Sequence, residues 1–167
     1  MYRSLDDFSS AYQQLTEGTQ KLLDALTDES LNQPVTEGHR TLGQMAWHLV
    51  VTIPEMIQRT GLPLSAIDHE TAPPSSASEI ATAYRTASDE LAQAITDQWT
   101  DADLDVVDDM YGQKWPRHLT ITALVHHEIH HRGQLTVLMR QAGLAVPGLY
   151  GPSKEEWGQY GMETPSY

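Results

Sequence analysis

Histidine is the residue type whose spacing in this sequence points most directly to chemistry. Four of the eight histidines fall within six residues, in the run LVHHEIHHRGQL. His127 and His131 lie four residues apart, so on a helix they share one face, about 6 Å apart, where two imidazoles can bind the same ion. Burying neutral imidazoles without partners costs about a few kcal/mol each, which favours metal ligation over core packing. His126 and His130 lie about 100° further round the helix and are expected to be exposed.

A third ligand is available near the middle of an earlier helical segment. His48, in MAWHLVV, lies beside apolar positions, and helical bundles collect metal ligands from facing helices. Together with His127 and His131 it would leave coordination positions open, as catalytic metals require. Three neutral nitrogen ligands suit Zn, Ni, Cu or Fe(II) better than Ca or Mg, and we expect metal release below about pH 6. The histidines predicted in loops or at helix edges, which receive no role, are His39, His69 and His118.

The same run contains a second possible motif. His127-Glu128-x-x-His131 matches the H-E-x-x-H pattern of zinc metallohydrolases. In those enzymes the glutamate is the general base, and a later residue, here Glu155 or Glu156, completes the site. The short chain and the lack of predicted strands to hold an extended peptide make this hydrolase the weaker hypothesis. A di-iron site would need a second Glu-x-x-His pair, which the sequence lacks.

The elements that must position these residues follow from hydrophobic periodicity and its breakers. Apolar residues recur at spacings of three and four in four segments, at about 4–27, 42–60, 78–99 and 120–142. Thr41 begins a predicted capping box, Ser78 is the predicted N-cap of the third segment, and a short hairpin is predicted to turn at Gly112. The predicted fold class is all-α: one four-helix-bundle domain over residues 1–167, with a loop-rich aromatic tail, 144–167, folded over it.

Composition limits the classes of function. The 167 residues include 10 Lys and Arg against 23 Asp and Glu, a formal charge of -13 that repels phosphate backbones and anionic lipids. We therefore expect no nucleic-acid or membrane partner. The absence of cysteine excludes disulfides, thiolate-ligated metal and a cysteine nucleophile. No segment has the pattern of a signal peptide or a spanning helix, so we expect a cytoplasmic protein.

The histidine pattern is similar to that of a known family. His48 on the second helix, with the run H-x-x-x-H-R-G-Q that begins at His127 on the fourth, resembles the DinB/YfiT-like superfamily over nearly the whole chain. The resemblance implies a metal-binding four-helix bundle whose three ligands correspond to His48, His127 and His131. It also implies zinc, nickel or a similar divalent ion, and a dimer. Several members are transferases or isomerases that depend on bacillithiol or mycothiol, and others have no known activity.

The residues and the resemblance together give one preferred function and one alternative. We expect a divalent-metal enzyme that activates a small thiol or water, of the thiol-dependent transferase type; the alternative is a non-catalytic, stress-related metal-binding protein. A thiol bound at an open metal position loses its proton more readily, so no cysteine of the protein is needed. The candidate catalytic side chains are Glu55, seven residues after His48 on the same helix face, and Glu128.

Further expectations concern the surroundings of this centre and the assembly. Arg132 and Gln134 are expected to hydrogen-bond near the ligand-bearing turn or to stabilise the helix packing, with an ordinary surface or boundary position as the alternative. Gly133 is expected to let a neighbouring helix approach closely. The partner is expected to be a small-molecule substrate or a low-molecular-weight thiol. Twelve aromatic residues leave apolar surface that four helices do not fully cover, which predicts a homodimer. The tail aromatics in this argument are Trp157, Tyr160 and Tyr167.

Overall fold

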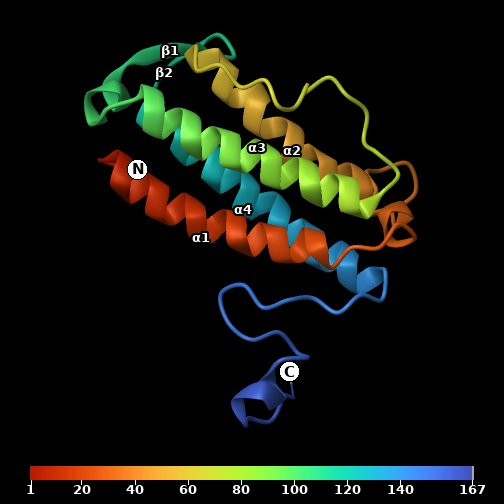
Figure 1. Cartoon of the computed structure of the whole chain (residues 1–167). Helices are drawn as coiled ribbons and strands as arrows, with labels where there is room; N and C mark the ends of the chain where they lie inside the picture. Colours follow the sequence, from red (N-terminus) through yellow and green to blue (C-terminus); the bar gives the residue numbers. More distant parts are fainter. Residues whose placement is uncertain (167) are drawn as a thin grey trace.

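Four long helices dominate the computed structural model, which describes residues 1–166 (Figure 1). They are α1 (Leu5–Asp24), α2 (Leu42–Ile57), α3 (Ala77–Gln98) and α4 (Arg117–Gln141). The described chain also contains β1 (Val107–Met110), β2 (Gln113–Pro116) and the short 3-10 helices η1 (Ser30–Asn32), η2 (Gln58–Thr60), η3 (Asp101–Asp105) and η4 (Trp157–Tyr160). The predicted all-α four-helix bundle is confirmed, and its helix boundaries differ from the predicted ones by a few residues at most.

The helices pack in an order that differs from their order along the chain. α1 packs on α3, α3 on α2, α2 on α4, and α4 returns to α1 (Figure 1). The largest fully buried side chains fill the space between them: Phe8, Tyr12, Leu22, Leu49, Ile53, Ile80, Tyr84, Leu91 and Ile95. Because α2 and α4 are neighbours, the two helices that carry the candidate metal ligands face each other.

Local hydrogen bonding fixes where α2 and α3 begin. The Thr41 capping box is confirmed: the Gln44 amide donates to Thr41 Oγ1 at 3.2 Å, and the Gln44 side chain accepts from the Thr41 amide at 2.9 Å. The prediction of Ser78 as the N-cap of α3 is wrong. Ser76 takes that position, with extended backbone and a side chain that accepts from the Glu79 amide. The helix can begin earlier because Asp28 also accepts from the amide of its first residue, at 2.7 Å.

The predicted hairpin forms between η3 and α4. β1 and β2 pair antiparallel up to Met110 and Gln113, so Tyr111 and Gly112 make the turn. Both turn residues have positive φ, 58° and 81°, which is unusual for a residue with a side chain. Side-chain contacts hold Tyr111 there, because its ring lies 4.3 Å from the Arg59 guanidinium and its hydroxyl donates to Glu55 at 2.6 Å. The hairpin tip is thereby fixed to the end of α2.

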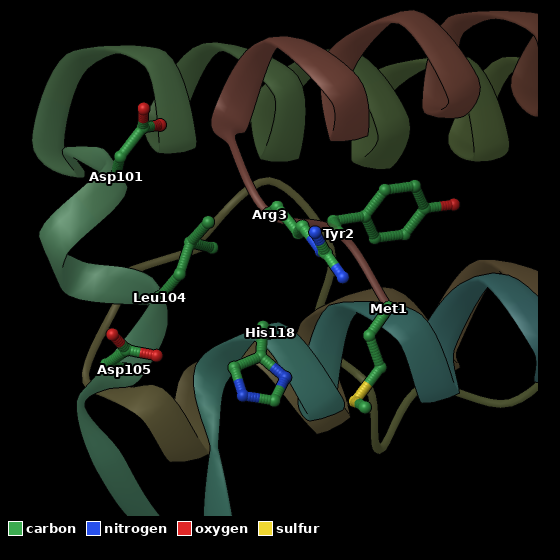
Figure 2. Close-up of a pocket in the computed structure, with 7 residues that line it drawn as sticks. All are labelled: Met1, Tyr2, Arg3, Asp101, Leu104, Asp105 and His118. Atoms are coloured by element: carbon green, nitrogen blue, oxygen red, sulfur yellow. The ribbon is translucent and has the colours of Figure 1, made fainter.

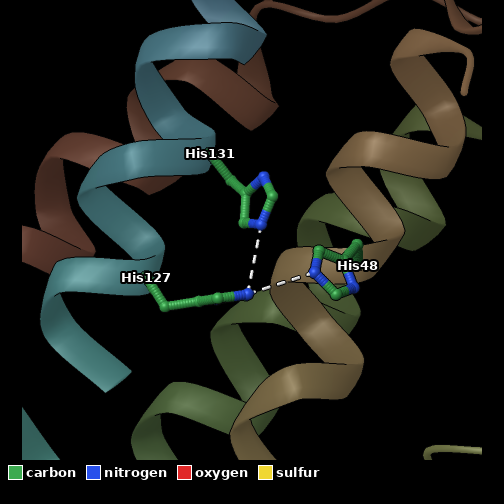
Figure 3. A group of neighbouring side chains, drawn as sticks. All are labelled: His48, His127 and His131. Carbon is green, nitrogen blue, oxygen red and sulfur yellow. Dashed lines mark hydrogen bonds between the residues drawn. The ribbon is translucent and has the colours of Figure 1, made fainter. Parts of the chain in front are cut away.

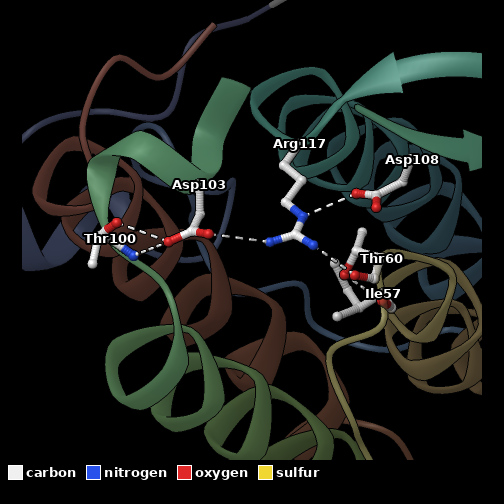
Figure 4. A network of polar contacts seen from close by, with 6 residues as sticks. All are labelled: Ile57, Thr60, Thr100, Asp103, Asp108 and Arg117. Carbon is white, nitrogen blue, oxygen red and sulfur yellow. Dashed lines mark hydrogen bonds and ion pairs between the residues drawn. The ribbon is translucent and has the colours of Figure 1, made fainter. Parts of the chain in front are cut away.

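A half-buried arginine fixes the start of α4 (Figure 4). Arg117 pairs with Asp108 at 2.9 Å and with Asp103 at 3.6 Å. It also donates to the Thr60 carbonyl at 2.9 Å and lies 4.8 Å from the centre of the Trp99 ring. One guanidinium therefore joins η3, β1, η2 and the end of α3 to the first residue of α4, the helix that carries two of the candidate ligands.

The tail covers the bundle only with its first residues. Val146 is buried and Leu149 packs against the core. Beyond this stretch the tail extends below the bundle (Figure 1) and is joined to α4 by the pairing of Glu155 with Arg140. Tyr160 is exposed, so the prediction of an aromatic tail folded over the bundle is wrong for its distal part. Tyr167 lies outside the described residues. None of the helices between residues 1 and 166 is long and apolar enough to cross a bilayer.

Candidate metal centre

The three histidines chosen from the sequence meet between α2 and α4 (Figure 3). His127 Nε2 lies 3.2 Å from His48 Nε2 and 3.1 Å from His131 Nε2. All three side chains are half-buried, and their ligand atoms lie within 4.8 Å of one another. Within residues 1–166 no other group of His, Asp or Glu side chains comes close enough to share an ion.

The spacing of the three nitrogens fits one metal ion. Zinc binds imidazole nitrogen at about 2.0–2.1 Å, and two ligands at the tetrahedral angle are then separated by about 3.3 Å. The separations of 3.1 and 3.2 Å around His127 are close to this value. The packing of α2 against α4 therefore holds the three imidazole nitrogens at the spacing expected of ligands to one ion.

A hydrogen bond that His131 donates to Gln134 determines which nitrogen of His131 is free to bind. Gln134 Oε1 lies 2.7 Å from His131 Nδ1 and can only accept, so Nδ1 carries the proton. Nε2 is then left with its lone pair, directed at the other two histidines. An outer hydrogen bond of this kind orients metal-binding histidines in proteins. The expectation that Gln134 bonds near the ligand-bearing turn is thus matched by the geometry.

Burial keeps the three imidazoles in the neutral form that a metal requires. Loss of solvent lowers the pKa of His48 and of His127 to about 4, and nearby Arg40 adds to the effect. Burial likewise lowers the pKa of His131, against the opposing influence of its bond to Gln134. At neutral pH all three nitrogens can therefore act as ligands without first losing a proton.

The other two histidines of the run lie outside the group. His126 and His130 are exposed, as their position on the helix predicts. His130 contacts the Gln134 amide nitrogen at 3.2 Å through Nε2. Its ring centre lies 4.9 Å from that of His131, so it borders the group without joining it.

Glu128 points away from the three histidines and into the core. Its side chain is 2% exposed and accepts hydrogen bonds from Thr19 at 2.6 Å and from the Tyr84 hydroxyl. Burial raises its pKa, although these bonds oppose the change. One residue along a helix is a turn of about 100°, which carries Glu128 from the α2 side, where His127 lies, to α1 and α3. A carboxyl group held there is not placed as a general base for a metal at the histidines.

The two glutamates expected to complete an H-E-x-x-H site, Glu155 and Glu156, also lie away from the histidines. Glu155 pairs with Arg140, and Glu156 accepts from the backbone amides of Gly148 and Ser153 at 2.9 Å. Both glutamates are thus bonded within or beside the tail rather than at the histidines. The metallohydrolase arrangement is therefore not formed by the residues that the structure describes.

Arg132 takes the packing role that was one of its two expected roles, whereas Gly133 does not act as the sequence suggested. Arg132 is 2% exposed and donates to the Leu15 carbonyl at 3.0 Å and to the Tyr150 hydroxyl, so it joins α4 to α1 and the tail. Gly133 is exposed, and a Cβ added there would meet nothing within 4 Å. The expected close approach of another helix at Gly133 is wrong; the close approach in this region is at Gly18, beside Arg132.

Glu55 lies on the same side of α2 as His48, and its charge weakly opposes the lowering of the pKa of His48 and His127 by burial. Its carboxylate is occupied by Arg59, at 2.7 Å, and by the Tyr111 hydroxyl, at 2.6 Å. Partial burial acts to raise the pKa of Glu55, but these two bonds outweigh it and the pKa is lowered. Glu55 is therefore a carboxylate at neutral pH, held at one edge of the site.

Sequence reasoning missed Arg40, whose charge acts on the histidines, and Tyr111, whose hydroxyl binds Glu55. Arg40 directly precedes the N-cap of α2, and its charge lowers the pKa of all three imidazoles. Its place in the sequence, about two helical turns before His48, was the only available signal. Tyr111 could not be placed, because the position of a hairpin tip depends on packing.

A separate cavity opens at the end of the bundle where α1 and α4 begin (Figure 2). It has a volume of about 450 Å³ and contains His118, which received no role from the sequence. Asp101, on its wall, accepts a hydrogen bond from the Leu5 amide at 2.8 Å and so caps α1. The residues drawn in Figure 2 are Met1, Tyr2, Arg3, Asp101, Leu104, Asp105 and His118.

Comparisons with known proteins agree with this architecture. A family model described as the DinB family matches residues 1–164. The uncharacterized protein YrdA of Bacillus subtilis strain 168 is 46% identical over 165 residues, 99% of each chain. The crystal structure of a DinB-like protein from Bacillus cereus ATCC 10987 is 44% identical, with a TM-score of 0.86 over 90% of this chain and 100% of that one. YjoA, a DinB-like protein from Bacillus subtilis, is 16% identical, with a TM-score of 0.68 over 88% and 99%, a likeness of fold alone.

Proposed function

The chain belongs to the DinB family, and we propose that it binds one divalent metal ion through His48, His127 and His131. The observation that carries the proposal is the fixed orientation of His131. Its Nδ1 is committed to Gln134, and its Nε2 lies 3.1 Å from His127 Nε2. Three neutral imidazoles at ligand spacing, on two facing helices, are a donor set for zinc or nickel rather than for calcium or magnesium.

We propose that the centre serves transfer chemistry on a small molecule, with a low-molecular-weight thiol or water as the activated group. A divalent ion with an open position supplies a Lewis acid that lowers the pKa of a bound thiol or water. The chain itself contributes the three neutral ligands and the hydrogen bond that orients His131. It has no cysteine, so the reacting sulfur would come from the substrate.

We further propose that the protein acts as a homodimer. The outer face of α4 carries two exposed apolar side chains about two helical turns apart, Ile129 at 38% and Val137 at 57% exposure. Gly133 lies between them and leaves the helix surface flat. Light scattering at micromolar concentration should give twice the mass of one chain; the mass of a single chain would refute the dimer.

Elemental analysis of protein purified without an affinity tag tests the metal proposal. The unaltered protein should hold one ion per chain, and alanine at His48, His127 or His131 should remove it. Alanine at His126 or His130 is the matched control, because these side chains leave the same helix in another direction. Loss of metal only in the control variants, or no uptake by the unaltered protein supplied with zinc or nickel, would refute the proposal.

Assays with bacillithiol, mycothiol and glutathione against simple electrophiles test the catalytic part. Metal-dependent turnover that disappears in the His127→Ala variant would support it. Stoichiometric metal without turnover of any thiol would favour the alternative, a non-catalytic metal-binding protein.

A further inference from the structure

We propose that Glu128 and Arg132 are positioning residues for the metal centre: they fix the rotation of α4 about its own axis and so direct His127 and His131 at α2. The inference rests on the proposed metal site and adds to it two buried residues that act through the ligands. Each of the two directly follows one of the ligands in the sequence.

The part of α4 that carries the ligands has little apolar contact with the core. Across residues 126–134, all within the described chain, the only buried side chains are Glu128 and Arg132, each 2% exposed. The apolar side chain of this segment, Ile129, faces solvent and is 38% exposed. The neighbouring buried apolar side chains are Val125 before the segment and Leu135 after it. About two and a half turns of helix are therefore held against the rest of the bundle by two charged side chains.

Glu128 joins α4 to two other helices. Its Oε1 atom accepts hydrogen bonds from Thr19 of α1, at 2.6 Å, and from the Tyr84 hydroxyl of α3. Both donors are fully buried, so their positions are fixed by the core around them. Because the two donors come from different helices, the carboxylate cannot move around the axis of α4 without losing at least one of these bonds.

Arg132 attaches α4 again one turn further along. Its guanidinium donates to the Leu15 carbonyl of α1 at 3.0 Å and to the Tyr150 hydroxyl. Gly18 of α1 leaves room for it, since an added Cβ there would lie 2.9 Å from Arg132 Nη1. Glu128 and Arg132 lie four residues apart on the same face of α4, so their opposite charges offset part of the cost of burying them.

These bonds fix an angle that apolar packing would not fix. The hydrophobic effect has no direction, whereas a hydrogen bond weakens steeply when its geometry changes. Rotation of α4 by one residue, about 100°, would bury Ile129 in place of Glu128, which apolar burial alone would favour. The same rotation would put Glu128 where His127 meets His48. Metal ligands must be held within about 0.5 Å of their working positions, and the two buried side chains provide that constraint from the opposite side of the helix.

Zinc affinity of the full-length protein, measured against a chromophoric chelator, tests the inference. Glu128→Leu should weaken zinc binding by about tenfold, the scale for a group that orients a ligand without contacting the metal. Glu128→Gln should keep the affinity, because the amide oxygen can accept both hydrogen bonds. The visible absorption of the Co(II)-loaded protein, which depends on ligand geometry, should change in Glu128→Leu and stay the same in Glu128→Gln.

A triple variant separates positioning from stability. Thr19→Val, Tyr84→Phe and Glu128→Leu together remove both donors and their acceptor, and replacing all partners of a buried bond by apolar groups of similar shape is close to neutral. The triple variant should therefore recover the stability lost in Glu128→Leu while its zinc affinity stays about tenfold weaker. Leu91→Ala is the converse control. It leaves a cavity at a fully buried position of α3, so it should lower stability and change zinc affinity by less than about twofold.

A variant on α1 tests Arg132 without changing α4. Gly18→Ala places a methyl group against Arg132 Nη1, so the guanidinium must move away from the Leu15 carbonyl. Alanine also favours the helix, which offsets the lost bond in stability. Zinc binding should weaken by about threefold, less than for Glu128→Leu because the Arg132 side chain is flexible. Gly133→Ala is the matched control, since a Cβ there meets nothing within 4 Å, and it should leave the affinity unchanged.

The outcomes separate this inference from the proposed function. If the unaltered protein binds no zinc, the proposed function fails and the positioning role fails with it. If the unaltered protein binds zinc, but Glu128→Leu keeps full affinity or the triple variant regains affinity together with stability, Glu128 only stabilises the fold and its positioning role is overturned while the metal site stands. Full affinity in Gly18→Ala would overturn the part assigned to Arg132.

Discussion

Replacing Gln134 tests how the chain prepares His131 for a metal. Gln134→Leu removes the acceptor of the His131 Nδ1 proton, a bond of 2.7 Å, and leaves His131 itself in place. Loss of such an outer bond lowers metal affinity by roughly 10- to 100-fold, or about 1.4 to 2.7 kcal/mol. Because Gln134 is exposed and water can replace part of the bond, we expect the lower end, about tenfold.

The opposite effect is expected from Gln134→Glu. A carboxylate is a stronger acceptor for the imidazole proton, so it should raise zinc affinity by about threefold. A general loss of stability would not lower zinc affinity in Gln134→Leu and raise it in Gln134→Glu. Competition with a chromophoric chelator gives the zinc Kd of each variant, and circular dichroism checks that the helices remain.

Two controls complete this experiment. Gln13→Leu removes an exposed amide from α1 that bonds only to Glu17, and it should leave zinc affinity unchanged. His130→Ala removes the other partner of Gln134 and should also have little effect. Unchanged affinity in Gln134→Leu, or a shift of the same sign in both Gln134 variants, would refute the argument that this hydrogen bond sets the tautomer of His131.

Three other expectations concern the core, the pH range and the start of α4. Burial raises the pKa of Glu128, so the folded protein holds this proton more tightly than the unfolded chain, and the free energy of unfolding should fall as pH rises through the carboxyl range. Chemical denaturation of Glu128→Gln should show no such pH dependence, and this variant should keep its metal. Glu128→Ala should lower the free energy of unfolding by about 3 kcal/mol, because it leaves the buried hydroxyls of Thr19 and Tyr84 without their acceptor. Burial lowers the pKa of His48 and His127 to about 4, below the value of about 6.5 for free histidine. Metal should therefore stay bound at about pH 5.5 and leave toward pH 4, a lower range than the release below about pH 6 that free histidine predicts. Complete release at pH 6 in an equilibrium dialysis series would contradict this. Arg117→Ala should lower the free energy of unfolding by about 3 kcal/mol, because it leaves two carboxylates without their half-buried partner, and equal stability in urea would show that the network contributes little.

Local patterns in the sequence determined the helices and one face of the site. A spacing of four residues places His127 and His131 on the same side of any α-helix, whatever packs against it. The Thr41 capping box is likewise local, since both of its bonds join residues three apart. The absence of cysteine is a matter of composition alone, and it excludes thiolate ligands from the chain in any fold.

The sequence also indicated His48, but only as a histidine near the middle of another helix. Its meeting with His127 requires α2 to lie against α4, a pairing of residues 79 positions apart. The resemblance to DinB proteins supplied that pairing, and the packing order of the helices provides its physical basis.

Tertiary structure alone decided the roles of Glu128 and Arg132. The H-E-x-x-H pattern describes spacing along the chain and does not say which helix covers the next face. Glu128 meets Thr19 across 109 positions, and Arg132 meets Leu15 across 117, because α1 packs on that side of α4. Such contacts depend on how segments distant in the sequence pack together. The spacing of residues along a single helix contains no information about that packing.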